Sequence, residues 1–369
     1  MAHILIVTNI PTPYRLALLK ELDLQLRRLN HSVEVVFAGD TEAGRNWVFK
    51  SDDSHVRSTV LNSRLNRGVF AYTGLLSLVK RIAPDVVIVG GFGVATVKLW
   101  ACSFASPIPY VIWSGATAGA HWENTWLRRL VRRMLVARAS GFIAYSAAAR
   151  DYLIALGAAR ENVHVALNAV DVEYFERKAA DLSGADRTLR FIYVGALTTR
   201  KRVDLAIKAF SVVVRQRPTA RLVIAGDGPS ARALHNLVSS LGVEESVIFL
   251  GFKQIADLPD LFSEACCMLF PTSYDIWGLV VNEAMASGVP CIASRHAVSA
   301  VELIDDGVNG FTVDFEATLD VADKMFYLCD HPAEAAAMGR AAQGKVRSTA
   351  TLPKAAAMIV TSLNQAIGI

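Results

Sequence analysis

Short runs of apolar residues alternate along the chain with longer segments in which apolar residues recur every three or four positions. The short runs are rich in valine and isoleucine and predict buried strands, whereas the longer segments predict amphipathic helices. Strands separated by helices in this way are typical of parallel sheets in α/β proteins. The predicted strands are 4–8, 33–37, 86–89, 110–113, 141–145 and 163–166 in the first half, and 190–194, 221–225, 247–250, 267–270, 290–293 and 310–313 in the second.

The same plan occurs twice, and a length of 369 residues is sufficient for two domains. We therefore predict two Rossmann-like, doubly wound domains, the first over residues 1–170 and the second over 188–350, joined by a polar linker at 171–187. The segment 351–369 carries apolar residues at helical spacing and is predicted as a helix that crosses back onto the first domain. Ligands are expected at the carboxyl ends of the strands, in a cleft between the facing domains.

Composition and charge exclude several classes of protein. A net charge of +4 and a pI of about 8.8 permit an anionic partner, but they are far from the charge density of a nucleic-acid binder. No apolar run reaches the roughly 18 residues that a membrane span needs. The N-terminal residues are predicted as a first strand and not as a signal peptide, so we expect a cytoplasmic protein.

The cysteines show neither a CxxC motif nor a Cys/His spacing typical of a metal site. They are Cys102, Cys266, Cys267, Cys291 and Cys329. We interpret them as small buried residues in a reducing cytosol, and we predict no metal site.

The stretch 271–294 contains two carboxylates eight positions apart, Asp275 in a loop and Glu283 within a predicted helix. Between them, Trp277, Gly278 and Leu279 bring backbone amides to the start of that helix, which is a natural site for an anion. One carboxylate on each side of an amide-lined turn suits a ligand with hydroxyls at both ends and phosphates in the middle. A nucleotide sugar has that shape.

A second candidate for phosphate binding follows the strand 190–194. Gly195 at the strand end is followed by three cations, Arg200, Lys201 and Arg202, immediately before a predicted helix at 203–215. Cations at the start of a helix oppose its dipole, and a bound diphosphate would offset that cost. A solvated basic loop is the alternative, and we favour the phosphate.

The segment Gly226–Ala231 imitates the glycine-rich fingerprint of dinucleotide-binding proteins. Pro229 stands inside it, and no acidic residue ends a second strand about twenty residues later. We therefore interpret this segment as a tight turn between a strand and a helix. In the first half, the loop from Asn9 to Arg15 and the glycines at 90–93 follow strand ends, where they line the cleft or simply form turns.

The segment 121–135 predicts a basic amphipathic helix. Its apolar stripe consists of Trp122, Trp126, Leu130 and Met134, and its arginines are Arg128, Arg129, Arg132 and Arg133. We expect the stripe to pack into the domain core. For the arginines, electrostatic docking to anionic lipid at the inner face of the membrane is the hypothesis, and an ordinary solvated face is the alternative.

With these motifs in hand, the chain resembles the GT-B retaining glycosyltransferases of family 4. Asp275 and Glu283 fit that family's E-x7-E motif with Asp in place of the first Glu, and Gly195 to Lys201 fits its phosphate-binding segment. The runs VIAGDGP, VIFLGF and GLVVNEAMASGVPCIAS are also similar, as are PYR, IPYVIWSGAT and NAVD in the first half. The resemblance spans nearly the whole chain and is strongest in its second half.

The resemblance implies roles for single residues. Lys201 would neutralise the leaving diphosphate, Asp275 would bind the hydroxyls of the transferred sugar, and Glu283 would bind the ribose. The remaining donor-side candidates are Gly195, Arg200, Gly251, Phe252, Trp277, Gly278, Leu279 and Val280, with the base near Gly251 and Phe252. The acceptor-side candidates are Asn9, Tyr14, Arg15, Gly91, Ser114 and His121.

The chain also departs from the family pattern. Ala196 stands where the family often has Arg, and Arg200 is our candidate for the missing charge. Where the family commonly places a His at the end of an N-domain strand, this chain has Ser114 or Gly115, and His121 is a possible substitute.

The resemblance predicts transfer of a sugar from an NDP-sugar, UDP- or GDP-linked, to a sugar or lipid-linked sugar acceptor, with retention of the α configuration and without a metal or cofactor. Assembly of bacterial cell-surface polysaccharide or glycolipid is the expected context. Two alternatives stay open: a GT-B epimerase that acts on the nucleotide sugar itself, and a catalytically silent protein that binds nucleotide sugars.

Overall fold

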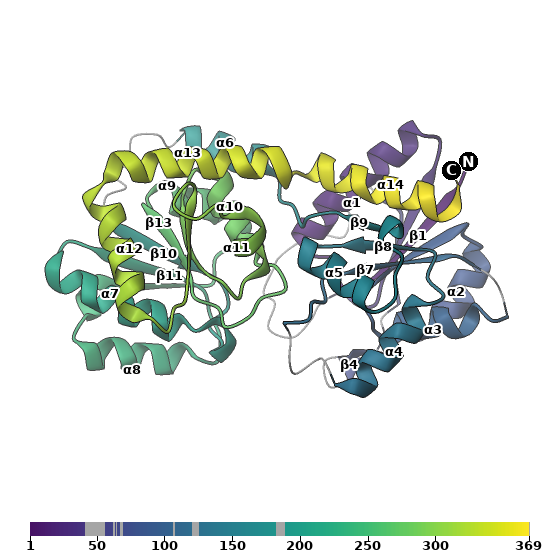
Figure 1. The fold of residues 1–369 in the computed structure, drawn as a ribbon, viewed down its shortest axis with the longest axis horizontal. Coiled ribbons are helices and arrows are strands. Elements are labelled where there is room, and N and C mark those ends of the chain that lie inside the picture. The colour runs from purple at the N-terminus through teal and green to yellow at the C-terminus, as the bar shows by residue number, and fades with distance from the viewer. Residues whose placement is uncertain are drawn as a thin grey trace. The chain divides into compact units, whose positions relative to one another are not determined.

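The structure is a computed structural model that describes residues 1–40, 56–61, 63, 65–66, 69–105, 108–119, 125–181 and 189–368. It divides into two compact units (Figure 1). Unit 1 comprises Met1–Ala169 together with Leu352–Ile369, and unit 2 comprises Val170–Thr351. Each unit is built around one parallel sheet, which confirms the predicted pair of doubly wound α/β domains.

The sheet of unit 1 has the strand order β3-β2-β1-β6-β7-β8-β9, and every neighbouring pair is parallel. Its strands are β1 (His3–Thr8), β2 (Ser32–Phe37), β3 (Ser58–Val60), β6 (Val86–Gly90), β7 (Tyr110–Ser114), β8 (Gly141–Ala144) and β9 (Val163–Val165). The order reverses between β1 and β6, so the loops after these two strands lie at the switch point where ligands of such sheets bind. The loop after β1 begins at Asn9, and the loop after β6 contains Gly91.

Two apolar cores cover the two faces of this sheet. Helices α1 (Pro13–Arg28) and α14 (Leu352–Ile367) contribute to one core, and α14 packs along α1. The other core contains residues of α2 (Leu75–Ile82), α3 (Val94–Cys102), α4 (Trp126–Val136) and α5 (Ala147–Ala155). A short antiparallel hairpin of β4 (Leu65–Asn66) and β5 (Val69–Phe70) completes the unit.

The sheet of unit 2 has the order β12-β11-β10-β13-β14-β15, also all parallel. Its strands are β10 (Arg190–Val194), β11 (Arg221–Ala225), β12 (Val247–Gly251), β13 (Cys267–Phe270), β14 (Cys291–Ser294) and β15 (Gly310–Val313). Its helices are α6 (Val172–Asp181), α7 (Val203–Gln216), α8 (Ala231–Leu241), α9 (Leu258–Ser263), α10 (Leu279–Ala286), α11 (Val298–Leu303), α12 (Thr318–Asp330) and α13 (Pro332–Thr349). Here the order reverses between β10 and β13.

The predicted linker at 171–187 is wrong over most of its described length, because residues 172–181 form helix α6 of unit 2. Val172 and Phe175 are buried, three positions apart on one face of the helix. Asp171 caps its first turn, since its carboxylate accepts a hydrogen bond from the amide of Tyr174 at 3.0 Å. The two apolar anchors and the cap outweigh the polar composition that suggested a linker.

The predicted core role of the basic helix is also wrong for its described residues. Trp126, Leu130 and Met134 of α4 are 77%, 49% and 45% exposed, and only Leu135 and Val136 of this helix are buried. Trp122 lies outside the described residues. An amphipathic pattern identifies an apolar face, but it does not identify what that face contacts.

The interpretation of Gly226–Ala231 as a tight turn agrees with the close approach of two backbones in unit 2. A Cβ atom at Gly226 would overlap the carbonyl oxygen of Gly195, and one at Gly228 would lie 2.5 Å from the carbonyl oxygen of Leu197. The amide of Leu197 donates to the carbonyl oxygen of Asp227 at 2.9 Å. These glycines therefore let the β11–α8 turn support the loop after β10.

Candidate active site

Two loops of unit 2 meet at the point where its strand order reverses. One follows β10 and ends in Arg200 and Lys201, and the other follows β13 from Pro271 onward. The carbonyl oxygen of Arg200 accepts hydrogen bonds from the amide of Ser273 at 2.9 Å and from the hydroxyl of Thr272 at 3.3 Å. Because β10 and β13 are parallel neighbours, their carboxyl ends bring these loops together although they are more than 70 residues apart in sequence.

Lys201 and Asp275 form an ion pair between these loops. The ammonium of Lys201 donates to Oδ2 of Asp275, and the two side chains are only 13% and 15% exposed. Nη1 of Arg200 lies 3.4 Å from the same carboxylate oxygen, and it also donates to the carbonyl oxygen of Tyr274 at 2.5 Å. Two cations thus share one carboxylate, which leaves a local excess of positive charge.

The environment of Lys201 is largely apolar on one side, because its ammonium lies 4.8 Å from the ring centroid of Phe270, the last residue of β13. Burial lowers the pKa of the Lys201 ammonium below its ordinary value, and the carboxylate of Asp275 opposes that shift. The pair therefore keeps a poorly solvated cation charged and fixed in position. An incoming anion would meet a cation that is already oriented.

Helix α10 begins four residues after Asp275, and its N-cap residue, Gly278, has no side chain to cap it. Gly278 has a φ of 97°, and a Cβ there would lie 2.7 Å from the ring of Phe270, so this position requires glycine. The amides of Leu279 and Val280 begin the helix and have no partner within it, which makes this turn a site for an anion. Ser299 supports this interpretation, because its hydroxyl is buried, lies beside Gly278 and has no hydrogen-bond partner in the part of the chain that the structure describes.

Glu283 follows one turn further along α10. It is 9% exposed, and burial raises the pKa of its carboxyl from the ordinary 4.5 to about 7. No cation of the described part of the chain lies within ion-pair distance of it. A buried acid whose pKa lies near neutral pH is suited to hydrogen-bonding the hydroxyls of a ligand.

The sequence predicts that Trp277 contributes its backbone amide at this turn. Its indole is 3% exposed and donates to Oδ1 of Asn282 at 2.9 Å, and its carbonyl oxygen accepts a hydrogen bond from the amide of Ser299. The side chain therefore fixes the turn before α10, and only the amide of Trp277 is left to face a ligand.

The other donor-side candidates lie along the same edge of the sheet. Gly195 ends β10 with a φ of 150°, and a Cβ there would lie 2.9 Å from the hydroxyl oxygen of Tyr193. Gly251 ends β12 with a φ of 68°, and Phe252 after it is 37% exposed. Since β11 separates β12 from β10, these two residues lie beside the switch point and not within it.

In unit 1, Arg15 is buried against aromatic rings at the first turn of α1. Its guanidinium carbon lies 4.0 Å from the ring centroid of Trp113 in β7, and Nη2 donates to the hydroxyl of Tyr145 after β8 at 3.0 Å. The ring of Tyr14 is 5.8 Å away. Among the described residues, buried Nη1 of Arg15 has no hydrogen-bond partner and no carboxylate pairs with this cation, so the aromatic rings are its main contacts.

The remaining acceptor-side candidates are spread along the carboxyl edge of unit 1. Asn9 accepts a hydrogen bond from the hydroxyl of Tyr72 at 2.6 Å, and Tyr72 has a φ of 49°, which is unusual for so large a side chain. Ser114 is buried, and its hydroxyl accepts from the amide of Ala116. Gly91 has a φ of 67° and open space beside it. His121 lies outside the described residues.

Several residues of these sites were missed by sequence reasoning. Phe270, Ser299 and Tyr72 lie in ordinary apolar or small-residue runs, and Trp113 and Tyr145 end predicted strands. For Phe270 a usable signal existed, because the last residue of a strand at the switch point must lie next to the loops that hold a ligand. The other four depend on contacts with residues that are distant in sequence.

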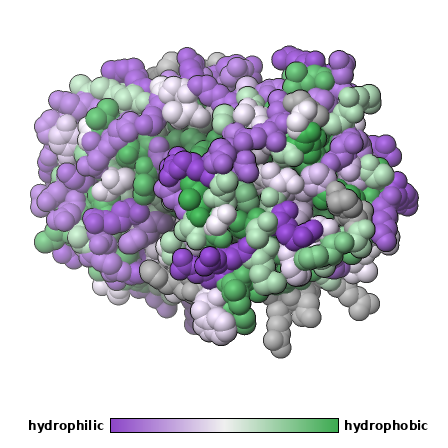
Figure 2. All heavy atoms as spheres, turned by 45° about the vertical axis from the view of Figure 1, so that its right-hand side comes forward, coloured by the Kyte–Doolittle hydropathy of each residue, from purple (hydrophilic) through white to green (hydrophobic). Residues whose placement is uncertain are grey.

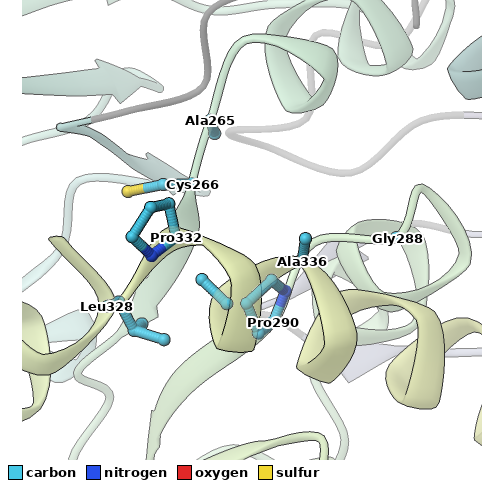
Figure 3. Close-up of a pocket in the computed structure, with 8 residues that line it drawn as sticks. Ala265, Cys266, Gly288, Pro290, Leu328, Pro332 and Ala336 are labelled. Carbon is cyan, nitrogen blue, oxygen red and sulfur yellow. The ribbon is translucent and has the colours of Figure 1, made fainter. Parts of the chain in front are cut away.

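A cavity of about 80 Å³ in unit 2 is separate from this site (Figure 3). Its lining is apolar and includes Cys266 before β13, Pro290 before β14 and Pro332 at the start of α13. Residues that precede β13 and β14 lie at the amino ends of the strands, whereas Lys201 and Asp275 lie at the carboxyl ends. In the described part of the chain, no three His, Cys, Asp or Glu side chains gather as metal ligands would.

Comparisons with known proteins identify the family and the fold. Residues 175–345 match the family of glycosyl transferases group 1, and residues 18–174 match glycosyltransferase family 4. Alpha-D-kanosaminyltransferase of Streptomyces kanamyceticus is 31% identical over 163 residues, which cover 44% of this chain and 42% of that protein. D-inositol 3-phosphate glycosyltransferase of Corynebacterium kroppenstedtii is 28% identical over 228 residues, which cover 58% of this chain and 50% of that protein.

The chain therefore spans half or less of the length of these two curated relatives. Among solved structures, HepE of Anabaena in complex with UDP has a TM-score of 0.79, with 21% identity over 98% of this chain and 99% of that one. HepE has also been solved with UDP-glucose. At this level of identity the likeness establishes the fold, and it confirms the expected GT-B architecture.

The raised pKa of Glu283 predicts how stability changes with pH. Its folded-state pKa of about 7 lies above the ordinary 4.5, so the folded protein loses stability as pH rises through that window, where the buried carboxyl must ionise. Glu283→Gln should therefore be more stable than the wild type at pH 8, by about 1–3 kcal/mol, and similar to it at pH 5. Chemical denaturation of both proteins at the two pH values measures this difference.

The matched control is Glu245→Gln, because this exposed carboxylate is hydrated whether the chain is folded or unfolded. The control variant should track the wild type at both pH values. A Glu283→Gln variant that is equally or less stable than the wild type at pH 8 would show that Glu283 is not a poorly solvated acid.

Proposed function

The chain belongs to the glycosyltransferases of group 1 and family 4, which its two halves match in turn, and from that membership we propose that it transfers a sugar from a nucleoside-diphosphate sugar to an acceptor hydroxyl with retention of the α configuration. The observation that carries the proposal is the arrangement of Lys201, Asp275 and the uncapped first turn of α10. It places an oriented cation and free amides on either side of one short loop.

The diphosphate of the donor would bind between Lys201 and the amides of Leu279 and Val280, with Arg200 at its exposed side. Asp275 carries a charge of the same sign as the diphosphate, so the phosphates would replace it as the partner of Lys201. Negative charge grows on the leaving diphosphate as the bond to the sugar breaks. Protein groups such as the Lys201 ammonium and the helix amides, already oriented toward that charge, stabilise the transition state more than the ground state.

Release from Lys201 would leave the carboxylate of Asp275 available to the hydroxyls of the transferred sugar. Asp275 is one methylene shorter than the glutamate of the family motif, so it reaches less far from the loop after β13. We propose that this difference contributes to the choice of donor sugar. The acceptor then attacks from the face that the diphosphate leaves, without a nucleophile from the protein.

Glu283 would accept hydrogen bonds from the ribose hydroxyls. Hydrogen bonds from two ribose hydroxyls favour the charged form of the carboxylate. They would therefore lower the raised pKa of Glu283 when the nucleotide sugar binds. The base would extend toward Gly251 and Phe252 at the end of β12. UDP is the nucleotide favoured by the likeness to HepE, which was solved with UDP and UDP-glucose, and GDP is the alternative.

The acceptor is proposed to be a sugar or lipid-linked sugar of a bacterial cell-surface polysaccharide or glycolipid, bound by unit 1. Support comes from the carboxyl edge of its sheet, where Asn9 is exposed and the rings of Tyr14 and Tyr145 are half-buried around the buried Arg15. Such surfaces suit sugars, which present hydroxyls at their edges and C–H groups on their faces. A lipid-linked acceptor would hold the enzyme at the cytoplasmic face of the membrane.

Replacing Lys201 tests the donor site. Lys201→Ala should lower kcat by roughly 10²–10³-fold, the range seen when one stabilising group is removed from a developing charge. Lys208→Ala is the matched control, because this exposed lysine of α7 forms a surface ion pair with Asp204 at 3.7 Å. Initial rates of NDP release with donor and acceptor measure the effect, and wild-type kcat in Lys201→Ala would remove Lys201 from the mechanism.

The configuration of the product tests the retaining mechanism. Proton NMR of the product formed from an α-linked donor should show an α-anomeric signal, with the reaction run in EDTA because metal-independent transfer is part of the proposal. A β-linked product would contradict retention, and loss of turnover in EDTA would contradict metal independence. Donor incubated alone should stay unchanged, whereas an isomerised nucleotide sugar would identify an epimerase.

A further inference from the structure

Apolar side chains reach the surface of the molecule in patches (green in Figure 2). Helix α4 of unit 1 exposes five large apolar side chains within nine residues. They are Trp126 (77% exposed), Leu127 (54%), Leu130 (49%), Val131 (39%) and Met134 (45%). At about 100° per residue, these positions fall within an arc of about 140° of the helix surface. This arc faces away from the core of unit 1, because the buried residues of α4 are Leu135 and Val136.

The arginines of α4 divide into two kinds. Arg132 packs against unit 1. Its Nη1 donates to the hydroxyl of Tyr152 at 2.8 Å, and its guanidinium carbon lies 5.3 Å from the ring centroid of Phe92. Arg128, Arg129 and Arg133 are exposed. Arg128 follows the apolar arc on one side and Arg133 on the other, so two cations border the apolar surface.

Neighbouring residues extend the same surface. Phe104, just after α3, is 64% exposed, and the guanidinium carbon of Arg138 lies 4.1 Å from its ring centroid. Val97 of α3 is 41% exposed. Apolar groups and cations thus occur together here as well, and α3 contacts α4.

We propose that the exposed face of α4 lies in the interface of an anionic lipid bilayer. Trp126, Leu127, Leu130, Val131 and Met134 insert between the lipid headgroups, and Arg128, Arg129 and Arg133 contact the lipid phosphates. The pattern is typical of helices that lie in a membrane surface: an apolar face, a basic border and a tryptophan near one end.

The charges of α4 favour a bilayer over a second copy of the chain. Residues 126–136 include four arginines and neither Asp nor Glu. Two copies of α4 packed face to face would therefore bring like charges together while burying the apolar arcs, which is unfavourable. An anionic bilayer satisfies the apolar arc and the arginines at once. This surface is independent of the donor site, which lies in unit 2.

Co-sedimentation with vesicles tests the proposal with the full chain. The wild type should bind vesicles of phosphatidylglycerol and phosphatidylcholine in low salt, bind more weakly in high salt, and show little binding to phosphatidylcholine alone. Leu130→Glu, which places a charge in the middle of the arc, should lower the partition coefficient at least tenfold. Replacing Arg128, Arg129 and Arg133 by Gln should lower it about 100-fold, at about fivefold per arginine.

Leu319→Glu is the matched control for the apolar position, because this leucine of α12 in unit 2 is 67% exposed. It should bind vesicles like the wild type. Donor hydrolysis, or transfer to a water-soluble acceptor, should be unchanged in Leu130→Glu, so that a failure of membrane binding is distinguished from a failure of the proposed reaction. Two results would overturn the proposal: no binding to anionic vesicles in low salt, or a dimer in solution that Leu130→Glu converts to a monomer.

Discussion

The ion pair between Lys201 and Asp275 is the interaction on which the rest of the donor site depends. Removing either charge from water is costly, so each of these poorly exposed groups requires the other. Their loops come from adjacent parallel strands, β10 and β13, and are tied together through the carbonyl oxygen of Arg200. The pair places a cation beside the first turn of α10 before any ligand arrives. In the proposed mechanism, a diphosphate takes over the role of Asp275.

Close backbone packing keeps those loops in place. Gly226 admits the carbonyl oxygen of Gly195, and Gly278 fits against the ring of Phe270 with no room for a side chain. Such contacts leave the loops little freedom, which preserves the direction of the amides at the start of α10. Whereas those contacts stabilise the loops, ionisation of the buried carboxyl of Glu283 lowers the free energy of unfolding of the ligand-free protein. A buried group whose charged form is poorly stabilised until a ligand binds is typical of a binding site.

Much of the fold was predictable because buried parallel strands leave a simple apolar pattern, and the predicted strands coincide with the observed ones to within a residue or two. The sequence assigned Lys201 and Asp275 separate roles, and their ion pair was not predicted, because it depends on β10 and β13 being neighbours in the sheet. The predictions that failed depended on what surrounds a segment: the apolar face of α4 is exposed, and Val172 with Phe175 packs a polar segment into unit 2 as a helix. The stacking of Arg15 on Trp113 requires knowledge of which strands are neighbours, so no local pattern predicts it.

The central claim is that Lys201 and the first turn of α10 recognise the diphosphate of a nucleotide sugar. Calorimetric titration with a nucleoside diphosphate and with the matching monophosphate, for both uridine and guanosine, tests it most directly. With the base that the protein accepts, the wild type should bind the diphosphate at least tenfold more tightly, and Lys201→Ala should lose most of that preference. Equal binding of diphosphate and monophosphate by the wild type, or an undiminished preference in Lys201→Ala, would contradict the account.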